Sequence, residues 1–170
     1  MKGPKVMSRE ITTGTALLAI VAALGLLAGC CCATSPNDAA AGVAAASLAW
    51  KQTFNAGDPA AVTALYAEDA ILSAPGKPAV RGRAAIGQYF VKTAAEFATA
   101  GLTVADAPLG EPVASGDLGY QWKTYTISDR SGAVVGSGQL LTLFRRTAGR
   151  WLIVGDTWNP DGAAPAPGAR

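Results

Sequence analysis

The spacing of apolar residues changes once along this chain, near residue 100, from a helical period to a period of two. Before that point Ile86, Tyr89, Phe90 and Phe97 recur near helical spacing, which predicts a helix over residues 83–99. After it, alternating residues between turn residues predict strands at 102–108, 111–115, 119–128, 133–147 and 151–158. Helices followed by strands indicate an α+β domain whose helices cover one face of an antiparallel sheet.

Two more helices and a short strand are predicted in the first half of the domain. Asp38 is placed to cap a helix that runs to about Phe54. Asp58 and Pro59, in "NAGDP", suit the start of a second helix that continues to Tyr66. The sequence "AILSAP" then indicates a short strand.

The first 29 residues resemble an export signal. Basic residues precede a segment, residues 16–28, that is apolar apart from one glycine and too short to span a membrane. The following "LAGC", residues 27–30, resembles the lipobox of bacterial lipoproteins, whose cysteine receives a diacylglyceryl group. We therefore expect cleavage before Cys30 and lipidation of its thiol, with translation starting at Met1 or Met7.

Lipidation would anchor the mature chain to a membrane without spanning it, because two or more acyl chains give stable attachment. We expect this chain in the cell envelope, on the periplasmic side of the outer membrane. Residues 30–37 then form a tether, residues 38–161 the folded domain and residues 162–170 a flexible tail. The alternative is an ordinary cleaved signal, in which the neighbouring Cys31 and Cys32 are incidental.

Composition excludes several classes of function. The chain has 14 basic and 12 acidic residues, and those outside the leader balance at 11 of each, so it carries no basic footprint for nucleic acid. Histidine is absent and the cysteines are consecutive, which excludes Ser-His-Asp and Cys-His catalysis and a usual zinc site. We expect no metal and no cofactor, and any acid–base chemistry must come from other side chains.

Two stretches carry a family resemblance: "WKQTFNAGDPAAVTALYAEDAILSAPGKPAVRGRAAIGQYF" and "GRWLIVGDTWNPD". Over about residues 45–161 the chain resembles the nuclear transport factor 2-like superfamily, in its ketosteroid isomerase and SnoaL-like polyketide cyclase branches and an uncharacterised bacterial group beside them. The resemblance implies a curved sheet wrapped around three helices as a cone, with an apolar cavity at the open end. It also implies frequent dimerisation through the outer face of the sheet. Such folds serve isomerases, cyclases, dehydratases, hydrolases and binding modules, so fold alone does not settle function.

The resemblance also locates the positions that carry chemistry in ketosteroid isomerase, which combines a carboxylate base with a tyrosine and a protonated aspartate. Counting along the matching motifs places Trp50 at the tyrosine, Ala74 at the base, and Thr142 or Leu141 at the second acid. An indole N–H can donate one hydrogen bond, but it supplies no acidic proton. Isomerase activity of that type is therefore not expected.

Aromatic and polar side chains are expected around the cavity, although any one aromatic is more often plain core. The candidates for a small apolar ligand are Trp50, Phe54, Tyr66, Tyr89, Tyr120, Trp122, Tyr125, Gln139 and Trp158.

Asp156 is the candidate acid or base, because it lies in "WLIVGDTW", a strand that is apolar on both faces. Simple alternation puts Asp156 on the same face as Val154 and on the opposite face from Ile153. If Asp156 faces the cavity, it is a polar anchor or a base with raised pKa. If it faces outward, it pairs with a cation such as Lys123 or Arg145.

Three functions remain open on the sequence. The first is a binding or assembly module, which the missing catalytic positions favour. The second is an enzyme of the SnoaL-like kind that uses Asp156 as acid or base. The third is a structural dimer whose cavity is filled by its own side chains. A filled cone favours the third, an open cone with a lone buried carboxylate the second, and an open cone without one the first.

Overall fold

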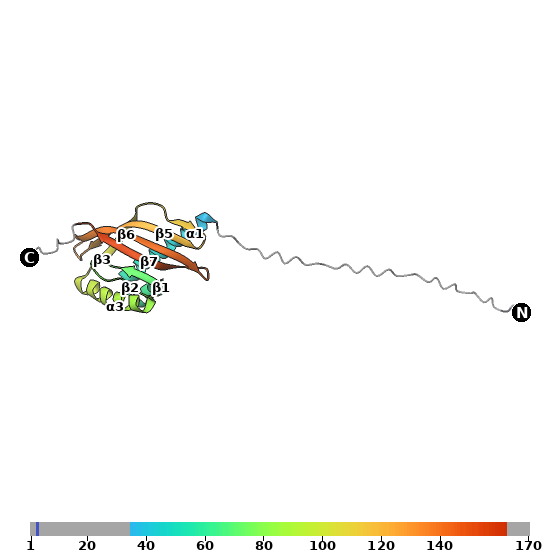
Figure 1. Cartoon of the computed structure of the whole chain (residues 1–170), viewed down its shortest axis with the longest axis horizontal. Helices are drawn as coiled ribbons and strands as arrows, with labels where there is room; N and C mark the ends of the chain where they lie inside the picture. Colours follow the sequence, from blue (N-terminus) through green and yellow to red (C-terminus); the bar gives the residue numbers. More distant parts are fainter. Residues whose placement is uncertain (1–2, 4–34, 163–170) are drawn as a thin grey trace, which may run out of the picture. The chain divides into compact units, whose positions relative to one another are not determined.

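The protein is described here by a computed structural model, which covers residue 3 and residues 35–162 (Figure 1). The expected leader, the lipidated Cys30, the first part of the tether and residues 163–170 of the tail lie outside the described residues. Among the described helices, none is long and apolar enough to cross a membrane.

Three helices form as the sequence predicts, with corrected ends. Helix α1 spans Pro36–Asn55, and its cap is Ser35 rather than Asp38, because the Ser35 hydroxyl accepts the Asp38 N–H at 3.1 Å. Asp38 lies instead in the first turn, where the helix dipole favours its charge. Helix α2 spans only Pro59–Thr63, and helix α3 spans Arg83–Ala100.

Helix α2 ends earlier than expected because the chain turns into a strand at Tyr66. The described strands are β1 (Tyr66–Ser73), β2 (Val80–Arg81), β3 (Thr103–Pro108), β4 (Val113–Ser115), β5 (Leu118–Ser128), β6 (Val134–Thr147) and β7 (Arg150–Pro160). All five strands after residue 100 match their predicted ranges within two residues at each end. The two-residue strand β2 was not predicted.

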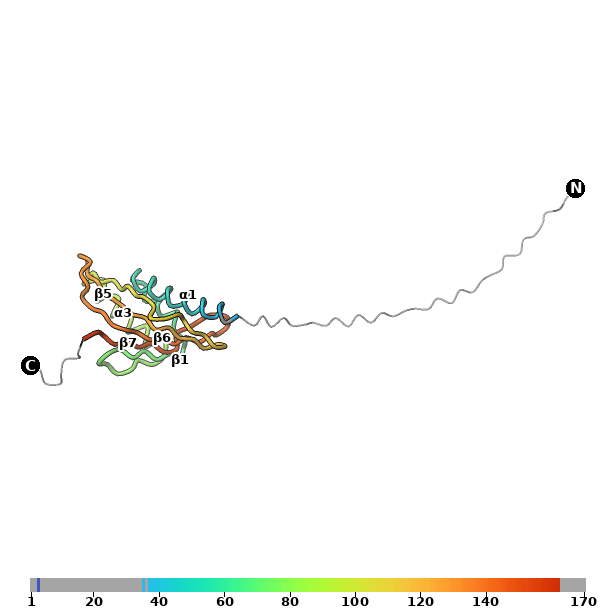
Figure 2. Tube along the Cα trace, turned by 90° about the horizontal axis from the view of Figure 1, so that it is seen from above, coloured from blue at the N-terminus to red at the C-terminus, as the bar shows by residue number. Residues whose placement is uncertain are grey.

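One curved, unclosed sheet holds these strands in the order β2-β1-β7-β6-β5-β3, with β4 paired to β5. The α+β class is confirmed, but the sheet is mixed rather than wholly antiparallel, because β1 pairs in parallel with β7. Helix α3 contacts β1 and β2, whereas α1 contacts β4, β5 and β3. In Figure 2, α1 runs along the sheet beside β5.

The core lies between the helices and the inner face of the sheet. Its largest fully buried side chains come from α1, α2, β1, α3, β6 and β7: Val43, Val62, Tyr66, Leu72, Ile86, Phe144 and Ile153. Burying side chains of this size is worth about 1.5–3 kcal/mol each, which fixes the helices on the sheet. Beyond this core, towards β3 and the second half of α3, the same layer opens into a cavity.

Candidate functional site

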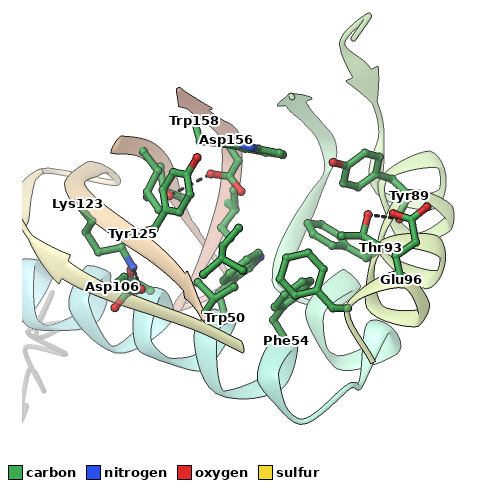
Figure 3. A pocket seen from close by; sticks show the side chains of 18 of the residues that line it. Trp50, Phe54, Tyr89, Thr93, Glu96, Asp106, Lys123, Tyr125, Asp156 and Trp158 are labelled. Atoms are coloured by element: carbon green, nitrogen blue, oxygen red, sulfur yellow. Dashed lines mark hydrogen bonds and ion pairs between the residues drawn. The ribbon is translucent and has the colours of Figure 1, made fainter. Parts of the chain in front are cut away.

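A cavity of about 300 Å³ lies between α1, α3 and the inner face of β3, β5, β6 and β7 (Figure 3). This volume is at the lower end of the range for small-molecule sites, about 300–1,000 Å³. Its wall is mainly apolar and aromatic, with Trp50, Phe54, Phe90, Phe97, Tyr125, Leu140, Phe144 and Trp158 among the lining residues. The cone is therefore open rather than filled by its own side chains.

A bulge in β7 directs Asp156 into this cavity. Leu143 of β6 pairs with Gly155, but Phe144 pairs with Ile153, so β7 has one extra residue at this point. The extra residue breaks the alternation, and Ile153 and Asp156 both line the cavity. The prediction that these two side chains face opposite sides of the sheet is wrong for this reason.

Asp156 is held by hydroxyl groups. The Tyr66 hydroxyl donates to Asp156 Oδ2 at 2.7 Å, and the Thr142 hydroxyl donates to Oδ1 at 3.1 Å. The Tyr66 oxygen in turn accepts the indole N–H of Trp50 at 3.0 Å. Thr142 lies opposite Asp156 in the ladder of β6 and β7, so the pairing of the strands itself sets this contact. Each carboxylate oxygen has a further lone pair with which it can accept a hydrogen bond from a ligand.

Burial is the largest single influence on the pKa of Asp156. It raises the pKa of Asp156 from 3.8 to about 6, against the hydrogen bonds from Tyr66 and Thr142 and the positive charge of Lys123, which all lower it. Among the described residues, no cation lies within ion-pair distance of Asp156, so the outward-facing alternative with Lys123 or Arg145 as partner does not hold. The carboxyl therefore exchanges its proton close to neutral pH.

Tyr66 is the support of this carboxyl rather than a wall of the cavity. Its side chain is fully buried beneath Trp50 and Phe90, and its ring lies 5.5 Å from that of Phe90. Burial, and then the charge of Asp156, raise the pKa of Tyr66 well above 10. The hydroxyl therefore keeps its proton and can act as a donor to Asp156.

A second polar group in the wall consists of Lys51, Asp106 and Lys123. The Lys51 and Lys123 ammonium groups donate to the two oxygens of Asp106 at 2.7 and 2.6 Å. Burial alone would raise the pKa of Asp106, but the hydrogen bonds from Lys123 and Lys51 outweigh it and hold this pKa below its ordinary value. Asp106 and Lys123 line the cavity, and Lys51 reaches them from α1.

The structure brings most of the predicted site residues together. Trp50, Phe54, Tyr89, Tyr125, Asp156 and Trp158 line the cavity. Three others do not: Tyr120, Trp122 and Gln139 lie around a shallow groove with Leu109 and Val113. Alternation along β5 explains this correction for Tyr120 and Trp122. Gln121, Lys123 and Tyr125 are buried on the inner face, so Tyr120 and Trp122 point outward.

The charged residues of the wall were missed as site residues. Lys123 is two residues from Tyr125, and Asp106 pairs with Tyr125 in the ladder of β3 and β5. Alternation from Tyr125 would therefore have placed Lys123 inside, but a lysine in a strand is normally assigned to the solvent side. The pairing of β3 with β5, which places Asp106 beside Lys123, could not be predicted from the sequence.

The positions of isomerase-type chemistry hold other residues. Trp50 donates to Tyr66, Thr142 donates to Asp156, and Ala74 is a buried residue just after β1. Leu141 is not among the residues of the cavity wall. Within residues 35–162, no cluster of acidic or sulfur side chains offers a metal site.

Comparison with known protein families shows to which family the domain belongs. The profile of the SnoaL-like domain matches residues 48–154, which is more than half of the chain. The chain belongs to the SnoaL-like family. A comparison with curated protein sequences found no match.

Many solved structures share the fold of this SnoaL-like domain. A ketosteroid isomerase-like protein from Erwinia carotovora atroseptica is 25% identical, with 75% of this chain and 99% of that chain covered and a TM-score of 0.61. An NTF2-like protein with a cystatin-like fold from Novosphingobium aromaticivorans is 21% identical, with 77% and 88% covered and a TM-score of 0.67. An NTF2-like protein from Pseudomonas putida is 18% identical, with 72% and 87% covered and a TM-score of 0.65.

Proposed function

We propose that this SnoaL-like domain binds a small, largely apolar molecule in the cavity and orients it by a hydrogen bond to Asp156. The observation that carries the proposal is a carboxyl in an apolar cavity, held by the neutral hydroxyls of Tyr66 and Thr142 and without an ion-pair partner among the described residues. A buried carboxyl costs free energy unless its hydrogen-bonding capacity is used. The hydroxyls of Tyr66 and Thr142 and the backbone N–H of Thr157 use part of this capacity. A ligand donor can bond to a remaining lone pair, and a ligand carbonyl can accept the proton of the neutral carboxyl.

Native mass spectrometry of gently purified protein tests this proposal. We expect a small molecule to be retained by the wild-type domain. Asp156→Asn should keep the fold and weaken binding of the recovered molecule by about 1–2 kcal/mol, the scale of one buried hydrogen bond. Asp117→Asn is the matched control, because Asp117 pairs with Arg146 on the surface. Equal binding by both variants and the wild type would contradict the role of Asp156.

Acid–base catalysis at Asp156 is the second candidate. It is favoured by a pKa of about 6, close to the neutral pH at which an acid or base exchanges protons efficiently. A neutral carboxyl can donate to a ligand carbonyl, and the ionised form can accept a proton from the adjacent carbon. The hydroxyl of Tyr66 holds the carboxyl in place for either role.

Exchange of the acidic C–H protons of cyclohexanone for solvent deuterium measures this activity without knowledge of the natural ligand. A positioned general base accelerates such a step by about 10²–10⁴-fold. We expect exchange above background, with an apparent pKa near 6, and its loss in Asp156→Asn. Exchange equal in the two proteins would leave binding as the only function at Asp156.

We also propose that the chain is exported and attached to a membrane through lipidated Cys30, as the "LAGC" sequence at residues 27–30 suggests. Cys30→Ala should abolish membrane fractionation and leave the domain folded, because the core lies within residues 35–162. Detergent-phase partitioning of the wild type and the variant measures this. A variant that still partitions into detergent would contradict lipidation at this residue.

A further inference from the structure

The group of Lys51, Asp106 and Lys123 leaves an excess positive charge in the wall of the cavity. Both lysines bond to the one carboxylate, at 2.7 and 2.6 Å. The Lys123 side chain is only 7% exposed and that of Asp106 is 9% exposed. The Lys51 side chain is 27% exposed, so water reaches it in part. Two ammonium groups against one carboxylate give a net charge of one, and the Lys123 end of the group is the part shielded from water.

A buried charge without a counter-ion is costly, so natural proteins normally pair such charges. One lysine is enough to neutralise Asp106. The second lysine adds a positive charge for which this group offers no further carboxylate. The Lys123 ammonium has three donors, of which Asp106 takes one. Lys123 also lines the cavity, so a molecule bound there is within reach of its side chain.

Among the described residues, no acid other than Asp106 lies within ion-pair distance of Lys51 or Lys123, although the charge of Lys123 lowers the pKa of Asp156. Asp156 lies on β7, and β6 separates it from Lys123 on β5, which places the two strands about 9–10 Å apart. Glu96 lies across the cavity on α3, beside Tyr89 (Figure 3). Lys77, the other lysine of the wall, is exposed, and its ammonium lies 5.8 Å from the centre of the Tyr89 ring.

We propose that the ligand is a small amphipathic anion, such as a medium-chain carboxylate, whose acidic group binds Lys123 and whose apolar body fills the aromatic part of the cavity. This inference rests on the proposed binding function and names the class of ligand. The apolar body would lie against Trp50, Phe54 and Phe97, and a polar group at its far side would hydrogen-bond to Asp156. A plain medium-chain carboxylate lacks that polar group and probes the contact with Lys123 alone. Hydrogen bonds between an ammonium and a carboxylate are among the stronger ones in proteins.

Three probes of equal chain length test the charge preference: octanoate, 1-octanol and octylamine. Trp50 and Trp158 line the cavity, so tryptophan fluorescence reports binding directly. We expect the wild-type domain to bind octanoate at least tenfold more tightly than 1-octanol, and octylamine most weakly. A tenfold ratio is the scale of one hydrogen bond to a charged group.

Lys123→Met should remove the preference for octanoate over 1-octanol, which is measured as the ratio of the two affinities in the same variant. The variant keeps the ion pair between Lys51 and Asp106, so its wall is neutral and its fold is supported. Lys51→Met is the second variant, since it neutralises the wall but keeps the contact between Lys123 and Asp106. It should reduce the preference only in part. Arg150→Met is the matched control, because Arg150 is an exposed cation at the start of β7 and lies outside the cavity wall.

The outcomes separate the two proposals. Binding of 1-octanol or octylamine at least as tight as that of octanoate would overturn the anionic ligand and retain an apolar binding site. A preference for octanoate that survives Lys123→Met but is lost in Lys77→Met would overturn the assignment to Lys123. Absence of binding by all three probes would overturn the anionic ligand together with the proposed function.

Discussion

Two opposing effects set the pKa of the Asp156 carboxyl group. Burial disfavours the charged form, whereas the hydroxyls of Tyr66 and Thr142 stabilise it. The balance raises the pKa of Asp156 to about 6, well above 3.8 but still short of a permanently neutral acid. A carboxyl that changes its charge near neutral pH is suited to a ligand site. In a purely structural core its ionisation would only destabilise the folded state.

The first prediction concerns the stability of Asp156→Asn. Because the pKa of Asp156 is raised from 3.8 to about 6 on folding, ionisation of Asp156 destabilises the folded state as pH rises through this window. The penalty is complete above about pH 6, at up to about 3 kcal/mol, since one pKa unit corresponds to about 1.4 kcal/mol. Asp156→Asn should therefore raise the free energy of unfolding above pH 6, and the gain should disappear near pH 4.

Urea unfolding of the wild type and Asp156→Asn between about pH 4 and pH 8 measures this difference. Subtracting the two curves removes the contributions of the other carboxyls, Asp106 among them. A difference that does not change with pH would show that Asp156 titrates alike in the folded and unfolded states.

A second prediction concerns the support of the carboxyl. Tyr66→Phe removes the hydroxyl that donates to Asp156 and accepts from Trp50. The pKa of Asp156 should rise further, because the lost hydrogen bond favoured its charged form. Leaving the Trp50 N–H without an acceptor should cost about 1–3 kcal/mol of stability. Carboxyl NMR titration and urea unfolding measure the two effects, and an unchanged or lowered pKa would contradict this role of Tyr66.

Residue types in the sequence predicted part of this site. Asp156 stands out because a carboxylate is rare in an otherwise apolar strand, and Trp50, Phe54 and Tyr125 follow from the family resemblance. Its direction could not be predicted, because the bulge in β7 depends on pairing with β6 rather than on β7 alone. Tyr120 and Trp122 were misplaced because an aromatic type says nothing about which face of the sheet it occupies.

At the scale of elements, β6 shows how closely the strands pack beside Tyr125 of the cavity wall. Gly138 faces the Tyr125 ring, and a Cβ there would lie 2.6 Å from the Tyr125 hydroxyl oxygen and overlap the backbone oxygen of Asn159. Gly136, two residues earlier, has only ordinary contacts with Ile127, the shortest at 3.6 Å. Strand β6 therefore requires glycine at position 138, whereas position 136 has room for a larger residue.

A third prediction compares the two glycines. Gly138→Ala should destabilise the domain by about 1–3 kcal/mol, because the backbone of Asn159 cannot move aside without breaking the ladder. Gly136→Ala should be neutral or slightly stabilising, since alanine restricts the unfolded chain more than glycine does. Thermal or urea unfolding of both variants measures the difference. Equal stabilities would show that β7 shifts freely at this point.

Element type and order could be read from the sequence better than strand pairing. The long strands and α3 follow from strong periodicity, and their ends from turn residues. The predicted range of helix α2 was too long because Leu65 and Tyr66 suit a helix locally. In the structure Tyr66 begins β1, and its hydroxyl bonds to Asp156 on β7. The parallel pairing of β1 with β7 joins distant parts of the chain, so no local signal predicts it.

At the scale of the whole molecule, the outer face of the sheet carries apolar side chains that the described domain does not cover. Val113, Tyr120 and Leu143 lie in one row across β4, β5 and β6, and each is at least 39% exposed. Trp122 lies nearby and is 44% exposed. Exposed apolar surface of this kind is typical of protein interfaces. We propose that two copies of the chain associate through this face.

The fourth prediction is therefore a homodimer. Residues 33–170 should sediment as a dimer at tens of micromolar, a concentration at which associations with a Kd of about 10⁻⁶ M are largely formed. Trp122→Lys should shift the protein to monomer, because it places a charge in the apolar face. Lys92→Gln, on α3, serves as the control. A wild-type monomer at this concentration would contradict the proposed interface.

The most direct test of the central claim, that the cavity holds a titratable carboxyl for a ligand, is an NMR titration of the Asp156 carboxyl carbon in residues 33–170. Asp156→Asn identifies the resonance. We predict a pKa of about 6 in the free domain, with a change in that pKa when octanoate binds. A pKa at or below the ~3.9 of a free aspartate, unchanged by octanoate, would contradict the account.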